Sequence, residues 1–90
     1  MATVKIPTPL RTLTNNDDSC EIDAATLSDV VSALESTYPG MQERLLDEGG
    51  EIRRFVNIFV NGEDVRFLSG LTTALDTGDE VSIVPAVAGG

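Results

Sequence analysis

The sequence contains no histidine and no tryptophan, one cysteine, and six lysine and arginine residues against fifteen aspartate and glutamate residues. Without histidine, the chain lacks the usual general base near neutral pH and the commonest metal ligand. A zinc site needs a cluster of cysteine and histidine residues, and no such cluster is present. The absence of a nucleophile–base pair makes a free-standing enzyme the least favoured function.

The shortage of positive charge restricts the class of partner. The net charge is −9, and the six cations are scattered along the sequence. Because affinity for phosphate backbones depends on lysine and arginine, we expect no nucleic-acid partner. An acidic body favours partners with basic docking surfaces, and it equally serves solubility alone.

Disulfides and long apolar runs are also missing. Cys20 is the only cysteine, so no internal disulfide can form. Residues 1–7 lack the apolar run of a signal peptide, and no stretch approaches the roughly 20 apolar residues that span a bilayer. We therefore expect a cytoplasmic protein without membrane association. Cys20 lies in a predicted strand, where a lone cysteine is usually a small, partly buried hydrophobe.

One long helix is predicted after Thr26, which is a good N-cap residue with Asp29 in capping-box position. Apolar residues follow at the spacing of a single helical stripe: Leu27, Val30, Val31, Leu34 and Tyr38. The pair Pro39-Gly40 ends this helix, and residues 41–46 are expected to add one or two helical turns.

Strands are predicted on both sides of the helix. Residues 3–13 and 19–24 are expected to form a hairpin with a loose polar loop, and residues 54–60 form the strongest strand. Asn61-Gly62 is a strong hairpin-turn signal, so residues 63–67 should return antiparallel. A short turn or 3₁₀ segment at residues 71–75 precedes a last strand at residues 80–84.

The predicted order is β-β-α-β-β-β. One apolar helix face must be buried against one face of a sheet. We therefore predict an α+β fold of the β-grasp (ubiquitin-like) type, with a mixed sheet of four to five strands and one main helix on one face. The domain is expected over residues 1–84, followed by a flexible C-terminal tail at residues 85–90.

The tail is the main candidate for function, because it is uncharged and ends in Gly-Gly. At roughly 3.3–3.6 Å per residue, six residues reach about 20 Å, enough to enter a partner's active-site cleft. Glycine has no Cβ, so the end of the tail fits a narrow channel. We predict that the reactive group is the C-terminal carboxyl of Gly90, with Gly89 permitting close approach.

A docking surface is predicted next to the tail. Side chains alternate along a strand, so Phe55, Asn57 and Phe59 should point away from the helix if Val56, Ile58 and Val60 face it. Val84 should point outward likewise, close to Pro85. Phe55 and Phe59, with Val84 and Pro85 near the base of the tail, then form an apolar patch in which Phe59 is the preferred phenylalanine, unless the segment 41–46 covers the phenylalanines or the face assignment is reversed.

The sequence resembles the MoaD/ThiS family of ubiquitin-like sulfur carriers, and within it the actinobacterial carriers for cysteine synthesis. The resemblance rests on residues 53–67, on Gly78-Asp79-Glu80-Val81, and on the closing residues 85–90, and it extends to the start of the chain and the helix. It implies that Gly90 is adenylated and becomes a thiocarboxylate. Partner contacts along the tail are then implied for Pro85, Ala86, Val87, Ala88 and Gly89.

The same resemblance implies cofactors on the partners and none on this chain. An E1-like adenylyltransferase of the MoeB/ThiF type uses ATP and Mg²⁺, and a sulfur donor protein displaces AMP. The acceptor is a synthase, either a cysteine synthase with pyridoxal phosphate or a thiosugar synthase, and a zinc metallopeptidase releases cysteine. Two alternatives remain open: the small subunit of molybdopterin synthase, and a ubiquitin-like protein modifier, for which Lys5 as the only lysine disfavours self-linked chains.

Overall fold

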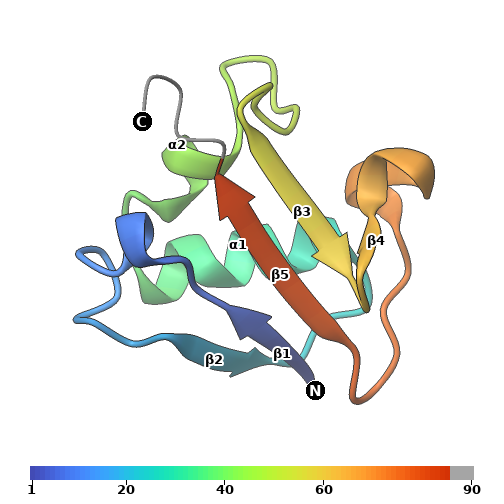
Figure 1. The fold of residues 1–90 in the computed structure, drawn as a ribbon, viewed down its shortest axis with the longest axis horizontal. Coiled ribbons are helices and arrows are strands. Elements are labelled where there is room, and N and C mark those ends of the chain that lie inside the picture. Colours follow the sequence, from blue (N-terminus) through green and yellow to red (C-terminus); the bar gives the residue numbers. More distant parts are fainter. Residues whose placement is uncertain (86–90) are drawn as a thin grey trace.

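The computed structural model describes residues 1–85, and its framework is a sheet with one main helix against it (Figure 1). The strands are β1 (Ala2–Lys5), β2 (Ser19–Ile22), β3 (Val56–Val60), β4 (Glu63–Asp64) and β5 (Glu80–Pro85). The helices are α1 (Leu27–Thr37) and α2 (Met41–Leu45), with 3₁₀ turns η1 (Thr8–Leu10), η2 (Val65–Phe67) and η3 (Gly70–Thr72).

The five strands form one mixed sheet in the order β2-β1-β5-β3-β4. β1 and β5 are parallel, and the other neighbouring pairs are antiparallel. β1 and β5 thus lie side by side in the middle of the sheet, while β2 and β4 form its edges. This arrangement confirms the predicted β-grasp fold.

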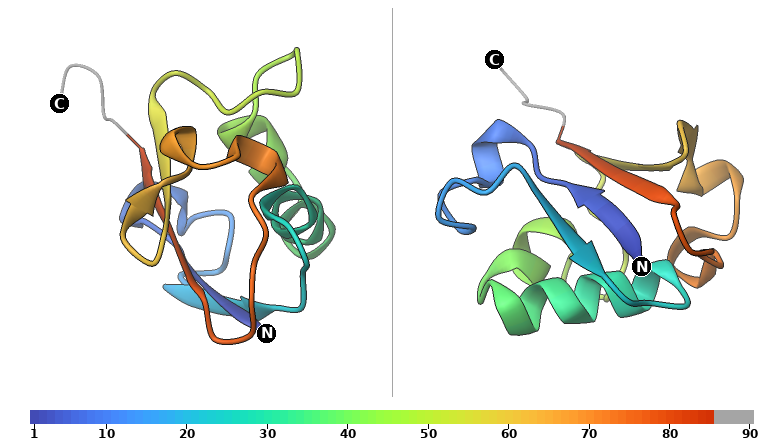
Figure 2. Two further views of the ribbon diagram at one scale, coloured as in Figure 1. Left: turned by 90° about the vertical axis from the view of Figure 1, so that its right-hand side faces the viewer. Right: turned by 90° about the horizontal axis from the view of Figure 1, so that it is seen from below.

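The helix α1 crosses one face of the sheet, as the two side views show (Figure 2). Its apolar stripe is buried as predicted, with Leu27, Val30, Val31 and Leu34 each at most 2% exposed. These side chains pack against the inward-facing residues of the strands: Ala2, Val4, Ile22, Val56, Ile58, Val60, Val81 and Ile83. Burial of this shared apolar surface is the main force that joins helix and sheet.

The start of α1 follows the sequence signal. Thr26 has extended backbone angles, and its hydroxyl accepts a hydrogen bond from the Asp29 backbone N–H at 3.3 Å. This bond satisfies one of the otherwise unpaired N–H groups of the first turn. At the other end, Tyr38 is only partly buried, and its hydroxyl donates to the Asp17 carboxylate at 3.2 Å.

Four predicted strands are shorter than expected: β2 ends at Ile22, β3 begins at Val56, and two others are shortened more. Residues 3–13 do not form one strand, because β1 ends at Lys5 and η1 begins at Thr8. Pro9 occupies an early position of η1, where its fixed φ and missing N–H favour a helical turn over sheet pairing. The predicted return strand at residues 63–67 is limited to β4, since the Asp64 carboxylate accepts the Arg66 N–H at 2.8 Å and starts η2.

The short helix α2 depends on a side chain of α1. The Glu35 carboxylate accepts backbone N–H groups of Gly40 and Gln42 at 2.9–3.2 Å, so it caps α2 across the Pro39-Gly40 turn. Gly40 has φ of +98°, which other residues adopt at a cost. Met41 and Leu45 are buried in the core, so α2 is held next to the end of the sheet.

Candidate functional site

The predicted reactive tail leaves the domain from the central strand β5. β5 extends to Pro85, one residue beyond the expected end, and Pro85 lies opposite Val56 of β3. Proline is tolerated here because β1 pairs with β5 only as far as Ser82. The predicted site residues Ala86, Val87, Ala88, Gly89 and Gly90 lie outside the described residues.

The predicted orientation of β3 and β5 is confirmed. Val84 is 45% exposed and lies opposite the partly buried Asn57, on the sheet face that α1 leaves uncovered. Phe59 lies opposite Ser82 on the same face and is partly buried. Val84 therefore offers free apolar surface near the end of β5, and Phe59 offers less.

Phe55 is the more exposed phenylalanine of this region. Its side chain is 57% exposed, so it is not covered by residues 41–46, whose Met41 and Leu45 turn into the core. Phe55 directly precedes β3 and is one residue from Val56, which pairs with Pro85. Phe55, and not Phe59 as expected from the sequence, is thus the more exposed phenylalanine beside the end of β5.

A cleft of about 440 Å³ lies at the same end of the sheet. It is lined by Glu43 and Arg44 of α2, by Arg53, Phe55 and Val56 of the β3 segment, and by Pro85. Two arginines and an exposed aromatic ring therefore line the same cleft as Pro85 at the end of β5. Arginine and aromatic residues are the side chains that most often dominate binding energy in protein interfaces.

The arginines of this region are held in place by neutral oxygens. The Arg53 Nε donates to the Glu43 carbonyl oxygen at 2.8 Å, and Arg66 Nη2 donates to the Arg53 carbonyl oxygen at 2.8 Å. Arg66 Nη1 also donates to Asn57 Oδ1 at 2.8 Å. These bonds fix the guanidinium groups of Arg53 and Arg66. Three of the six cations, Arg44, Arg53 and Arg66, are therefore linked in this region through the cleft lining and the Arg66–Arg53 bond.

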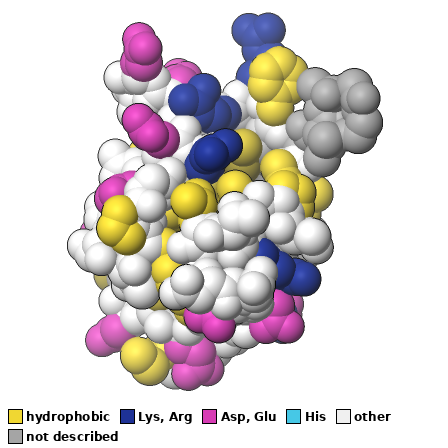
Figure 3. All heavy atoms as spheres, turned by 90° about the vertical axis from the view of Figure 1, so that its left-hand side faces the viewer, with side chains coloured by type: hydrophobic (Ala, Val, Ile, Leu, Met, Phe, Trp, Pro, Cys, Tyr) yellow, Lys and Arg dark blue, Asp and Glu magenta, His cyan; other side chains and the backbone are white. Residues whose placement is uncertain are grey.

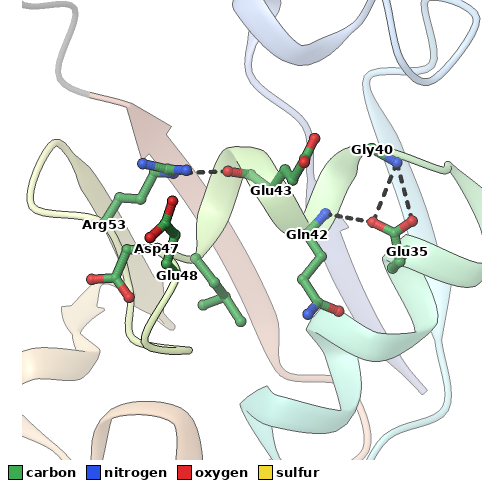
Figure 4. A pocket seen from close by; sticks show the side chains of 8 residues that line it. Glu35, Gly40, Gln42, Glu43, Asp47, Glu48 and Arg53 are labelled. Carbon is green, nitrogen blue, oxygen red and sulfur yellow. Dashed lines mark hydrogen bonds between the residues drawn. The ribbon is translucent and has the colours of Figure 1, made fainter.

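A second, larger cleft lies between α1, α2 and the following loop. Its volume is about 670 Å³, and its lining is mainly acidic: Glu35, Gly40, Gln42, Glu43, Leu46, Asp47, Glu48 and Arg53 (Figure 4). The Glu35 carboxylate is already used as the cap of α2. Across residues 1–85 no group of three or more His, Cys, Asp or Glu side chains is arranged to hold a metal ion.

The single thiol has no activating neighbour. Cys20 of β2 is partly buried, and burial raises the pKa of its thiol, with the negative charge of Asp17 raising it further. A raised thiol pKa leaves little of the nucleophilic thiolate at neutral pH.

In the part of the chain that the structure describes, no helix is long and apolar enough to cross a bilayer.

Comparison with known proteins assigns the chain to a family. Residues 4–90 match the ThiS family. The chain is 53% identical over 90 residues to the sulfur carrier protein CysO of Mycobacterium tuberculosis, covering 98% of this chain and 97% of that protein. It is 48% identical over 68 residues to small archaeal modifier protein 3 of Haloferax volcanii, covering 76% of this chain and 73% of that protein.

Solved structures agree with this result. One chain in the crystal structure of the BexX/CysO complex of Amycolatopsis orientalis superposes with a TM-score of 0.94 at 44% identity, and each chain is covered completely. The predicted resemblance to sulfur carriers is confirmed in sequence and in fold. This protein is therefore a member of the ThiS family.

Proposed function

We propose that this protein is a sulfur carrier of the CysO type, which holds sulfur as a thiocarboxylate on Gly90. The observation that supports it best is the 53% identity to CysO over almost the full length of both proteins. The family match also extends through Gly90, so it includes the residue whose carboxyl would carry the sulfur. The protein then acts as a substrate of its partner enzymes and not as a catalyst.

Activation of the carboxyl requires a partner. A carboxylate is a poor electrophile, so an E1-like adenylyltransferase of the MoeB/ThiF type would join it to the α-phosphate of ATP, with Mg²⁺, and release pyrophosphate. Sulfur from a donor protein would then displace AMP and leave the thiocarboxylate. In this proposal Ala86, Val87 and Ala88 line the partner's channel, and Gly89 allows the close approach that a Cβ would block.

Docking near the tail would position this chemistry. Val84 and Pro85 lie at the end of β5, and Phe59 lies on the same sheet as Val84. These residues would contact the adenylyltransferase while the tail enters its active site. Binding by a rigid sheet surface reduces the entropic cost of placing the carboxyl at the α-phosphate.

The sulfur acceptor would be a synthase, and the resemblance to carriers for cysteine synthesis favours cysteine formation as the acceptor reaction. The thiocarboxylate sulfur would add to an aminoacrylate held by a pyridoxal-phosphate cysteine synthase and form a thioester. An acyl shift from sulfur to the amine would leave cysteine in amide linkage to Gly90, and a zinc metallopeptidase would hydrolyse that bond to release cysteine. A thiosugar synthase would be an additional acceptor. The occurrence of a CysO chain in a complex with BexX supports direct contact between such a carrier and a partner protein.

A modifier function is the second candidate, because small archaeal modifier protein 3 is 48% identical over 68 residues. In that case the activated Gly90 carboxyl would form an isopeptide bond with a lysine of another protein. Lys5 is exposed but is the only lysine, so chains of this protein would have a single lysine acceptor.

Intact-mass measurement of the protein isolated from its host separates these functions. A mass increase that corresponds to replacement of one oxygen by sulfur supports the carrier, and an added cysteine supports the cysteine route. High-mass conjugates that an isopeptidase cleaves would instead support the modifier. Unmodified protein from cells starved of cysteine, with no adenylate formed by the adenylyltransferase in vitro, would contradict the proposal.

A further inference from the structure

We propose that the cleft between α2 and the start of β3 is a recognition site for an acidic segment of the partner that acts on the Gly90 carboxyl. The proposal rests on the function proposed above, because that function requires a partner at the end of β5. It adds to that function the side chains that select this partner. The cleft is formed by Glu43, Arg44, Arg53, Phe55, Val56 and Pro85.

The cleft lies at the base of the tail. Pro85 lines the cleft and is also the last residue of β5. A partner that receives the tail must therefore surround this cleft. The partner surface around the channel entrance would then contact Arg44 and Arg53. These two side chains are therefore placed to distinguish one partner from another.

Charge is the second argument. The chain carries −9 overall, yet this cleft holds two arginines, Arg44 and Arg53, against one carboxylate, Glu43, and Arg66 bonds the Arg53 backbone. On the face shown in Figure 3, several Lys and Arg side chains lie in the upper part close to exposed hydrophobic ones, with Asp and Glu side chains to one side of them. A local positive patch on an acidic protein attracts acidic partner groups and repels basic ones.

Available hydrogen bonds are the third argument. Arg53 uses Nε for the Glu43 carbonyl oxygen, as seen from the neighbouring acidic cleft (Figure 4), and the same side chain lines both clefts. A planar guanidinium held at one edge can offer its remaining N–H groups to a carboxylate in paired geometry. Phe55, 57% exposed, supplies apolar contact beside it. An acidic side chain flanked by an apolar one fits this arrangement.

The test compares two variants with equal net charge. Arg44→Gln with Arg53→Gln removes both cleft cations, whereas Ser28→Glu with Ser32→Glu adds two negative charges on exposed positions of α1. Binding to the ThiF/MoeB-type adenylyltransferase of the same organism is measured by calorimetry at about 0.1 M and about 1 M salt, where charges are screened beyond roughly 10 Å and 3 Å. Arg53→Lys keeps the charge and controls for the loss of the Nε bond, and thermal melts check that each variant is folded.

We expect the arginine variant to bind at least about fivefold more weakly than wild type at the lower salt, with Ser28→Glu/Ser32→Glu unchanged and the difference lost at the higher salt. Equal binding by the two double variants would overturn the proposal, because net charge and not the cleft would then control affinity. A difference that persists at high salt would overturn it as well.

A titration followed by backbone NMR separates this inference from the proposed function. A short polyglutamate peptide added to the full chain should shift the amide signals of Arg53 and Phe55, even if no adenylyltransferase binds. No shift would overturn the acidic-segment proposal. Shifts caused by ATP alone, with none from polyglutamate, would identify a phosphate site and overturn it too.

Discussion

The Asn61 side chain connects the β3–β4 turn to the loop before β5 through a hydrogen bond from its Nδ2 to Asp79 Oδ1 at 2.9 Å. Its Oδ1 accepts the Glu80 N–H at 2.9 Å, so one amide joins the turn to the start of β5 twice. The other oxygen of Asp79 accepts the Asp76 N–H at 2.8 Å. Through these bonds Asp79 holds both the β3–β4 turn and the loop that precedes β5.

This arrangement predicts a defined acid sensitivity. The Asp76 N–H and the Asn61 amide lower the pKa of Asp79 below its ordinary value of 3.8. A carboxylate with a lowered folded-state pKa stabilises the fold above the unfolded pKa, and this contribution is lost as pH falls through the folded pKa. We therefore expect Asp79→Asn to lower the melting temperature at pH 7 and to lose less stability than wild type between pH 5 and pH 2.

Asp76→Asn is the matched control, because it removes the same charge from the same loop while the Asp76 backbone N–H remains. Melting curves across this pH range measure both variants. Parallel curves for Asp79→Asn and wild type would show that the Asp79 bonds do not contribute to stability.

The raised pKa of Cys20 predicts slow thiol chemistry. Because burial and the Asp17 charge disfavour the thiolate, iodoacetamide should alkylate the folded protein more slowly at pH 8 than the unfolded protein. Asp17→Asn should increase the folded rate, while Asp18→Asn should change it less. Alkylation rates followed by mass spectrometry decide this, and equal rates for folded and unfolded chains would contradict it.

The cap on α2 predicts a cost for losing Glu35. Glu35→Ala removes the acceptor of the Gly40 and Gln42 N–H groups and should lower the free energy of unfolding by about 1–2 kcal/mol. Amide exchange at those two residues should accelerate. Glu48→Ala removes the same charge from an exposed loop position and should have little effect in urea denaturation. If Glu48→Ala lowered the free energy of unfolding as much as Glu35→Ala, the effect would come from the change in net charge and not from the lost cap.

The threading of the tail predicts that Gly89→Leu blocks activation without unfolding the domain. A misplaced carboxyl should slow adenylation by about a hundredfold, since reactions in active sites depend on near-ideal placement. Ala25→Leu adds a similar side chain at an exposed position and should be adenylated normally. ATP–pyrophosphate exchange with the adenylyltransferase measures the rate, and a normal rate for Gly89→Leu would refute threading.

The docking role of Val84 predicts weaker activation in Val84→Thr. Threonine keeps the β-branched shape that suits β5 but places a hydroxyl where apolar contact is expected, so adenylation at limiting carrier should fall about threefold. Phe67→Thr is the control, because Phe67 is 88% exposed on η2 and its loss removes more apolar surface. A larger effect from Phe67→Thr would move the docking surface to η2.

Much of the fold follows from local sequence. The Thr26 cap, the stripe of α1 and the alternation of β3 act over a few residues, and each is found as predicted. The Asn61-Gly62 turn has the expected positive φ at both residues, 51° and 87°. The lengths of β1 and β4 are overestimated from sequence, because a proline or a carboxylate close to the end of each strand favours a 3₁₀ turn over continued pairing.

The Gly-Gly end, the missing histidine and the family resemblance are properties of the sequence alone, and they direct attention to Gly90. The surroundings of the strand that carries the tail are a tertiary property. Pairing of Pro85 with Val56, and capping of α2 by Glu35, bring Pro85 to one cleft with Arg44 and Phe55 although Pro85 is far from both along the chain. No local pattern contains these distances, because they result from strand register and from the burial of α1 and α2 against the sheet.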